Sequence, residues 1–304
     1  MADVVIDASA LADLLLNGPL GAAVARPTLQ VQVHVDTQHR VYAVSPDGFS
    51  GAIDRPFAHS KEVHAGSALP TTGGFERARA ENFRLQEVFT YGAAHTVVSG
   101  NKNEKDDSFN TLASATLEEL NILDMVTADR IVARVSSKQY INDPEPTILT
   151  LGTRIENLRI AGCPVQVEFD NDLFRRLGTF KFFTDEYNGN QQTQQMLQTR
   201  LLGNKPKSDV PEFLHERYNW FDKDKFGSKG IVLCTLVKEI KTNCPELQIY
   251  GNVVVVPQFG KIYFGEIALQ RNQRELSTFR VELGSAVGGS SNGPGGAGGG
   301  STYP

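Results

Sequence analysis

Residues 29–35 read Leu-Gln-Val-Gln-Val-His-Val, and this alternation points to the fold class. In an extended chain the four apolar side chains fall on one face, and the two glutamines and the histidine fall on the other. A period of two predicts a strand with one buried face. Residues 40–44 follow a polar turn, and we expect them to pair with this strand as a hairpin.

The same period of two recurs along most of the chain. Valines 253–256 form an unbroken apolar run, which predicts a strand buried on both faces. The sequence therefore predicts a mainly β protein, built as an antiparallel β-sandwich or as barrel-like sheets. Further strand-like runs are 83–91, 95–99, 130–135, 148–151, 165–169, 231–238, 247–256, 262–269 and 278–283. The side chains expected in the core are Val31, Val33, Ile131, Val135, Leu158, Ile160, Val167, Val254, Phe279, Val281 and Leu283.

A helical spacing replaces this alternation near residues 170–205. Apolar residues from Leu173 to Phe183 recur at steps of three and four, after candidate N-caps at 170–172. A second helical stretch covers 191–202 and ends before a glycine. We therefore expect a helical insertion or cap. The expected parts are a β-rich portion with a short N-terminal helix (1–169), a helical insertion (170–229), a second β-rich portion (230–284) and a glycine-rich tail (285–304).

A weak internal repeat links two segments 38 residues apart. Residues 117–122 read Leu-Glu-Glu-Leu-Asn-Ile, and residues 155–160 read Ile-Glu-Asn-Leu-Arg-Ile. The apolar positions match at the first, fourth and sixth residues. Two copies predict either duplicated hairpin units of a sandwich or neighbouring rungs of a coil.

Composition and charge exclude several classes of protein. Apolar residues make up 40% of the 304 residues and charged residues 21%, which is enough apolar material for a sizeable core. The net charge of −5 argues against a general surface for nucleic acid or anionic membrane, because both require clustered positive charge. No window approaches 18 apolar residues, so we expect no membrane span.

The first 25 residues contain Asp3, Asp7 and Asp13 and no basic residue. A secretory signal would begin with Lys or Arg and continue into a longer apolar block. We therefore expect a cytoplasmic protein by default. Export by a route without a signal, and with it a surface location, stays open.

The three cysteines, Cys163, Cys234 and Cys244, are too few for a disulfide framework. We expect all three to be small, buried, unreactive thiols. The alternative is a bridge between Cys234 and Cys244. None belongs to a Cys-x-x-Cys pair, and no histidine lies at ligand spacing, so we expect no zinc site.

Motifs for other metals, for cofactors and for catalysis are weak. The sequence has no glycine-rich dinucleotide or phosphate loop and no Gly-x-Ser-x-Gly elbow. On a strand His59 and His64 would point to opposite faces. Residues 222–227 begin like a calcium loop, but Phe226 and Leu233 stand where oxygen ligands are needed. We therefore expect no catalytic motif, metal site or cofactor.

Two sets of residues are candidates for a site. A hydrolase could use a pair of carboxylates about 5–9 Å apart; the candidates are Glu145, Glu156, Glu168, Asp170 and Asp172. Exposed strand faces and helix caps are the alternative explanation for these carboxylates. Phe182, Tyr187 and Trp220 could form a surface on which a sugar stacks, in a pocket between the helical cap and the sheet. The alternative is that such aromatic residues pack the cap onto the sheet.

The last twenty residues, 285–304, contain eight glycines and no charge. Such a composition buries too little surface to order by itself. We expect either a flexible tail or a segment that orders only against another subunit.

Several phrases resemble those of a bacterial family without an assigned function. They are residues 41–48, 120–130, 156–162 and 257–260, and the resemblance covers most of the chain. The middle phrases are also similar in rhythm to some secreted bacterial β-proteins. This resemblance implies a bacterial, β-rich protein and transfers no functional residue.

These observations favour a non-enzymatic structural protein that acts through homo-oligomeric association. Long strands, the lack of a recognised catalytic motif and the glycine-rich tail support this hypothesis, because strand edges are natural sites for pairing with other chains. The alternative is a β-domain that binds a carbohydrate or another small ligand. A hydrolase that uses the carboxylates near 145–172 is the third hypothesis.

Overall fold

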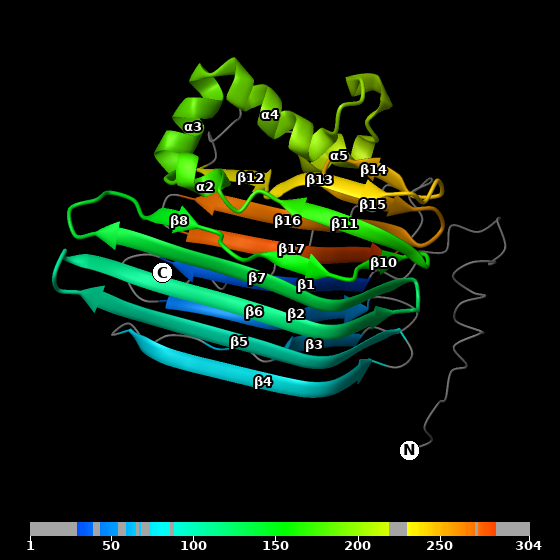
Figure 1. Cartoon of the computed structure of the whole chain (residues 1–304), viewed down its shortest axis with the longest axis horizontal. Coiled ribbons are helices and arrows are strands. Elements are labelled where there is room, and N and C mark those ends of the chain that lie inside the picture. The colour runs from blue at the N-terminus through cyan, green and yellow to red at the C-terminus, as the bar shows by residue number, and fades with distance from the viewer. Residues whose placement is uncertain are drawn as a thin grey trace.

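Two antiparallel sheets pack face to face in the computed structural model, which confirms the expected β-sandwich (Figure 1). The structure describes residues 29–38, 43–53, 59–64, 67, 73–85, 88–218, 230–270 and 273–283. It describes side chains only from Ser67 and Gly73 onward. The expected N-terminal helix and the tail at 285–304 lie outside these residues.

The first sheet, sheet A, joins the two ends of the described chain. Its order is β14-β15-β16-β17-β1-β2-β3, with β12 beside β16. β1 pairs with β2, but the expected partner segment is wrong: residues 29–35 lie opposite residues 46–53, and not opposite 40–44, because the second strand continues through Ser45–Gly48. The strands are β1 (Leu29–Gln38), β2 (Ala43–Ile53), β3 (His59–His64), β12 (Ile231–Thr235), β14 (Gln248–Tyr250), β15 (Val253–Val256), β16 (Gly260–Gln270) and β17 (Gln273–Leu283).

The second sheet, sheet B, is built mainly from consecutive strands. Its order is β13-β11-β10-β7-β6-β5-β4, with β8 and β9 also beside β7. The strands are β4 (Gly74–Leu85), β5 (Phe89–Asn103), β6 (Ser108–Ile122), β7 (Val126–Tyr140), β8 (Thr147–Leu149), β9 (Arg154–Glu156), β10 (Arg159–Ile160), β11 (Cys163–Phe169) and β13 (Val237–Thr242). The predicted single run 83–91 is wrong, because a turn separates β4 from β5. The pairing of Phe83 with Tyr91 keeps the apolar residues in phase across that turn, so the alternation hides it.

The core lies between the two sheets and matches the expected residues. Every predicted core residue whose side chain is described is buried, from Ile131 at 0% exposure to Val167 at 9%. The side chains of Val31 and Val33 lie outside the described set. The run 253–256 is buried on both faces as expected, since Val254 faces the main core and Val253 faces the helices.

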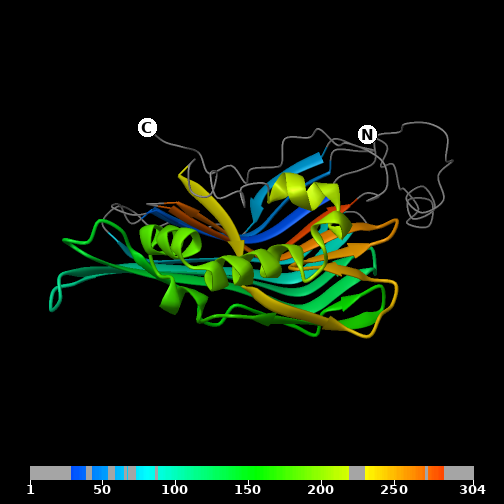
Figure 2. The same cartoon turned by 90° about the horizontal axis from the view of Figure 1, so that it is seen from above.

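Helices cover one side of the sandwich. They are α2 (Leu173–Arg176), α3 (Phe180–Gly189), α4 (Gln191–Leu202), α5 (Glu212–Arg217) and a 3-10 turn at Lys207–Asp209. Seen from above, they run along the top of the sandwich (Figure 2). Leu201, Leu214 and Tyr218 pack against Val255 and Tyr263 on the outer face of sheet A. None of the described helices is long and apolar enough to cross a membrane.

The predicted single helix after Asp172 is broken into α2 and α3. The Asp172 side chain makes no cap hydrogen bond, whereas the Thr179 hydroxyl accepts one from the Phe182 amide and starts a new helix. Between them, the Gly178 carbonyl accepts a hydrogen bond from the Ile148 amide. A Cβ on Gly178 would lie 2.8 Å from the Thr147 methyl group, so the close approach to β8 requires a glycine here.

The weak sequence repeat corresponds to the two segments that flank β7 in sheet B. Residues 117–122 lie along one side of β7 and residues 155–160 along the other. Matching residues face the same partner, so that Glu118 and Glu156 both pair with Arg130. The repeat therefore belongs to strands of a sandwich that share β7 as their common partner.

A third copy of the repeat appears at residues 80–85, Ala-Glu-Asn-Phe-Arg-Leu, which the sequence analysis missed. The third residue of each copy has a positive φ: 52° at Asn82, 56° at Glu119 and 51° at Asn157. This left-handed residue turns two successive side chains outward. The apolar residues of each copy are therefore spaced three and then two positions apart. The repeat corresponds to a kink in the backbone that occurs at each of these three places in sheet B.

The prediction of three unpaired cysteines is wrong for two of them. Cys163 and Cys244 form a disulfide with a Cα–Cα distance of 5.9 Å, and the alternative bridge from Cys234 is also wrong, because Cys234 is a buried free thiol. The physical reason is the pairing of β11 with β13. Val165 faces Thr242 in that ladder, and two more residues along each strand bring the two cysteines opposite each other.

Candidate functional site

The aromatic candidates do not gather on one surface. Phe182 lies on α3 with 48% of its surface exposed, whereas Tyr187 on the same helix is fully buried. The Tyr187 hydroxyl accepts a hydrogen bond from the Gln198 amide at 3.0 Å, between α3 and α4. Trp220 lies outside the described residues. Tyr187 therefore packs the helical cap, and Phe182 is the one described aromatic of the three that reaches solvent.

Each candidate carboxylate has a structural partner. Glu145 accepts a hydrogen bond from the Lys181 amide in the first turn of α3. Ion pairs hold the others: Glu156 with Arg154, Glu168 with Lys238, Asp170 with Arg176 and Arg200, and Asp172 with Arg175. These contacts fit the alternative explanation of exposed faces and helix ends.

The pKa shifts in this set run against a general acid. Burial acts to raise the pKa of Asp170, but the hydrogen bond and charge of Arg200 and the charge of Arg176 lower it overall. The hydrogen bond from Lys238 lowers the pKa of Glu168. A general acid in a hydrolase needs a raised pKa, so we do not propose hydrolysis here.

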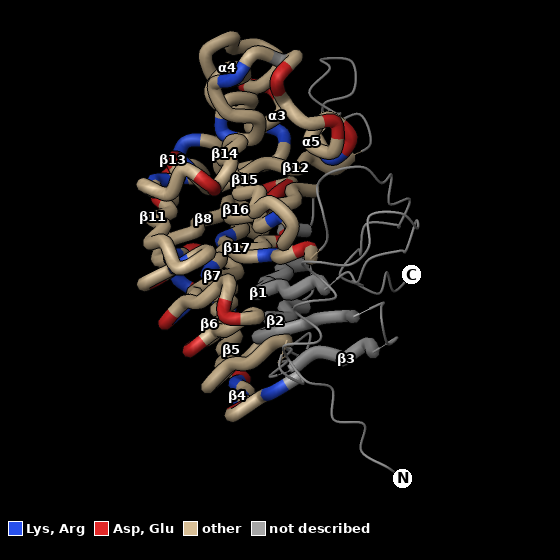
Figure 3. Tube along the Cα trace, turned by 90° about the vertical axis from the view of Figure 1, so that its right-hand side faces the viewer, with Lys and Arg blue, Asp and Glu red and all other residues tan. Residues whose placement is uncertain are grey.

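The edge strand β4 is one of two features that stand out. It lies at the end of the sandwich away from the helices (Figure 3). Among the described strands β4 pairs with β5 alone, over its length of 12 residues. Phe75 on this strand is 66% exposed. Arg79 and Glu81 form an ion pair on its outer face. An edge of this length offers a row of backbone groups to another strand.

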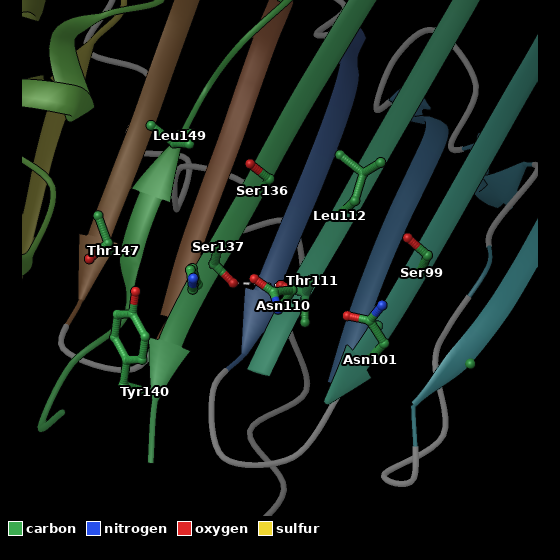
Figure 4. A pocket seen from close by; sticks show the side chains of 13 residues that line it. Ser99, Asn101, Asn110, Thr111, Leu112, Ser136, Ser137, Tyr140, Thr147 and Leu149 are labelled. Atoms are coloured by element: carbon green, nitrogen blue, oxygen red, sulfur yellow. Dashed lines mark hydrogen bonds between the residues drawn. The ribbon is translucent and has the colours of Figure 1, made fainter. Parts of the chain in front are cut away.

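The second feature is a polar hollow at the end of sheet B near the β5–β6 turn. It is lined by side chains of Ser99, Asn101, Asn110, Ser136, Thr147 and Tyr140, among others, and has a volume of about 670 Å³. Figure 4 shows these side chains spread across β5, β6, β7 and β8. Most of them lie on the outward positions of their strands.

One charged side chain, Lys138, belongs to the lining of the hollow. Its ammonium donates to the Asp106 carboxylate at 2.7 Å and lies 4.6 Å from the centre of the Tyr140 ring. The hydrogen bond between the two raises the pKa of Lys138 and lowers that of Asp106, so both stay ionised at neutral pH. The hollow therefore carries a neutralised ion pair at its rim.

Sequence reasoning missed both features. The hollow residues are single serines, threonines and asparagines from strands up to 48 positions apart, Ser99 to Thr147. No motif marks them, because only strand pairing brings them together. The exposed edge of β4 follows from its place in the sheet order, which sequence alone does not reveal.

The chain belongs to a family defined by a domain of unknown function (DUF8256), whose model matches residues 41–270. No curated protein matches the chain, and no solved structure matches it. The expected membership of a family without an assigned function is thus confirmed. Membership brings no activity, so function has to be argued from the edge and the hollow.

Proposed function

We propose that this chain acts by homotypic association, in which the edge strand β4 pairs with β4 of a second copy. The observation that carries this proposal is the length of the edge: β4 has a ladder partner on one side only among the described strands. Antiparallel addition of a strand satisfies the backbone groups of both copies. It also joins two sheets into one continuous sheet.

The charges on β4 select one register of such a pair. A two-fold axis through Ala80 places Arg79 of each copy opposite Glu81 of the other. Both side chains lie on the outer face and are largely exposed. Shifting the axis to Ala78 would instead place Arg77 opposite Arg79. Charged residues on an edge strand discourage pairing with unrelated strands. The charges on β4 therefore favour pairing with β4 of a second copy, in this one register.

The expected affinity is modest. Each exposed cross-strand ion pair contributes about 0.2–1 kcal/mol. Backbone hydrogen bonds and the covering of Phe75 supply the rest, against the cost of bringing two chains together. We therefore expect an assembly that depends strongly on protein concentration.

A charge-swap series at β4 tests the proposal. Arg79→Glu replaces two symmetric attractions with repulsions and should raise the dissociation constant by about tenfold or more. Arg79→Glu combined with Glu81→Arg restores the complementarity and should recover most of the association. Sedimentation equilibrium over a range of concentrations gives both constants. Arg154→Glu on β9 makes the same charge change far from β4 and serves as the control.

Two results would overturn the proposal. One is a full-length chain that stays monomeric at every concentration. The other is an unchanged dissociation constant in Arg79→Glu. Deletion of 286–304 is a separate arm: if the tail drives assembly, the deletion abolishes it while Arg79→Glu has no effect.

We also propose that the protein works in an oxidising compartment. The bond between Cys163 and Cys244 supports this, because disulfides persist mainly in such compartments. Counting thiols in freshly extracted protein tests it. One reactive thiol after unfolding agrees with the proposal, and three would favour the cytoplasmic location instead.

A further inference from the structure

We infer that the polar hollow binds a neutral carbohydrate, independently of association through β4. Its volume of about 670 Å³ falls in the range of about 300–1,000 Å³ typical of sites for small molecules. The hollow differs in place from the pocket expected between the helical cap and the sheet. It lies instead at the end of sheet B near the β5–β6 turn.

The hollow contains hydrogen-bonding side chains that the fold does not use. Among the described residues, the side chains of Ser99, Asn101, Ser136 and Thr147 make no hydrogen bond to another part of the chain. Hydroxyl and amide groups donate and accept equally, and this is the pattern that neighbouring sugar hydroxyls require. Four such groups around one hollow provide several simultaneous contacts with a single ring.

The charge of the lining favours a neutral ligand. Lys138 would attract an anion if its ammonium were available, but Asp106 already holds it at 2.7 Å. The other lining residues are uncharged. A ligand with a carboxylate or phosphate would therefore meet a neutralised rim, and it would lose hydration without gaining an ion pair. A neutral ligand has no such cost.

The hollow also offers apolar surface on a rigid frame. Tyr140 lines the hollow and is 44% exposed, and Phe75 pairs across the strands with the lining residue Ser99. Aromatic rings accept the C–H faces of sugars, while the polar groups fix the orientation. Behind the hollow, on the inward positions of β6 and β7, the Thr111 and Ser137 hydroxyls are 2.5 Å apart and link the two strands. Because paired strands hold every contact group, the site is preformed.

A glycan array tests the class of ligand. The full-length protein should bind neutral glycans and show no preference for sialylated, sulfated or uronic acid glycans. The best neutral hit, cut down to its terminal disaccharide, is then measured by saturation-transfer NMR and titration. Ser136→Val and Asn101→Leu should each weaken its binding by about tenfold, as expected for the loss of one or two hydrogen bonds.

Matched variants separate a binding defect from a folding defect. Ser114→Val lies on β6 outside the lining and should leave binding unchanged, and all variants should keep the far-ultraviolet spectrum of the parent. Arg79→Glu should leave carbohydrate binding intact, which keeps this inference distinct from association. No binding to any neutral glycan, a preference for acidic glycans, or normal binding by folded Ser136→Val would each overturn the inference.

Discussion

The outer faces of the two sheets carry charge clusters in opposite environments. On sheet A, Glu266 and Arg280 are 3% and 2% exposed and lie beneath α5, with Arg217 reaching down to them; we call these three residues the buried cluster. On sheet B, Glu118 bridges His95 and Arg130 across the strands, in water; we call these the exposed ladder. The same type of ion pair therefore contributes to stability according to what covers it.

The buried cluster satisfies most of its polar groups. Arg217 donates two hydrogen bonds to the two oxygens of Glu266, at 2.6 and 2.7 Å. The Tyr218 hydroxyl donates to the same carboxylate at 2.7 Å. The Arg280 guanidinium lies 4.0 Å from the centre of the Tyr263 ring. Arg280 also donates to Glu282. Removing Glu266 would take away the carboxylate that lies between Arg217 and Arg280 in a buried setting, which costs far more than breaking a pair in water.

The largest expected effect is that of Glu266→Ala. It leaves Arg217 and Arg280 facing each other with their shared carboxylate gone, so we expect a loss of about 3–5 kcal/mol in the free energy of unfolding. Glu118→Ala in the exposed ladder should cost about 0–1 kcal/mol. Urea denaturation of both variants measures the two losses. Equal losses would break the distinction between the two faces.

The sequence predicted the strand that carries Arg280 but not the burial of this residue. Residues 278–283 alternate strictly, and Phe279 and Val281 face the core as expected. The same alternation places Arg280 outward, which is correct. Its burial depends on α5, which lies more than sixty residues earlier in the chain and packs there through tertiary contacts. Alternation predicts on which face of the sheet a side chain lies, but it does not predict which other element covers that face.

The same limit explains the missed disulfide and the missed hollow. Cys163 and Cys244 are 81 residues apart, and only the β11–β13 ladder brings them together. Ser99 and Thr147 reach one hollow through the order of β5 to β8. The repeat, in contrast, lies within short segments of six residues, so it can be read from the sequence without knowing how the strands pair. Two of its three copies were recognised in this way. Local patterns predicted the elements, whereas the candidate sites arise from how the elements pair.

The stability that Glu266 contributes to the buried cluster depends on pH. Burial acts to raise the pKa of Glu266, but the charges of Arg217 and Arg280 lower it from 4.5 to about 2. A depressed pKa in the folded state contributes stability above pH 4.5, and this stability is lost as the pH falls towards 2. The contribution of Glu266 is about 3 kcal/mol at neutral pH.

Stability measured from pH 6 to pH 2 tests this assignment in the parent and in Glu266→Gln. The difference between the two proteins should shrink over the window from pH 4.5 to 2. A difference that stays constant over that window would show that Glu266 does not titrate with a depressed pKa. Glu118→Gln provides the reference for an exposed carboxylate.

Substitution of two glycines, Gly251 and Gly92, tests how tightly the outer face of each sheet is packed. Gly251, in the turn between β14 and β15, has φ of 53°, and a Cβ there would lie 2.4 Å from the Leu201 backbone at the end of α4. The atoms nearest to a Cβ on Gly92 in sheet B belong to the exposed side chain of Glu119, whose carboxylate can move aside while its Cβ stays 3.2 Å away. We expect Gly251→Ala to cost about 2 kcal/mol and Gly92→Ala less than about 1 kcal/mol. Thermal denaturation ranks the two, and a larger loss for Gly92→Ala would reverse the comparison.

The smallest expected effect is that of Arg130→Ala in the exposed ladder. Arg130 donates to Glu118 at 2.7 Å and lies 3.9 Å from Glu156, and 43% of its side chain is exposed. Water screens both pairs, so we expect only a small loss of stability, far below that of Glu266→Ala. Because the Debye length falls from about 10 Å at 0.1 M salt to about 3 Å at 1 M, the loss should shrink further in 1 M NaCl. The loss caused by Glu266→Ala should change little with salt, since salt does not enter the buried cluster.

Urea denaturation of both variants at both salt concentrations gives the four values. A loss for Arg130→Ala that persists unchanged at 1 M would mean that packing of its long side chain on sheet B, rather than its charge, contributes the stability.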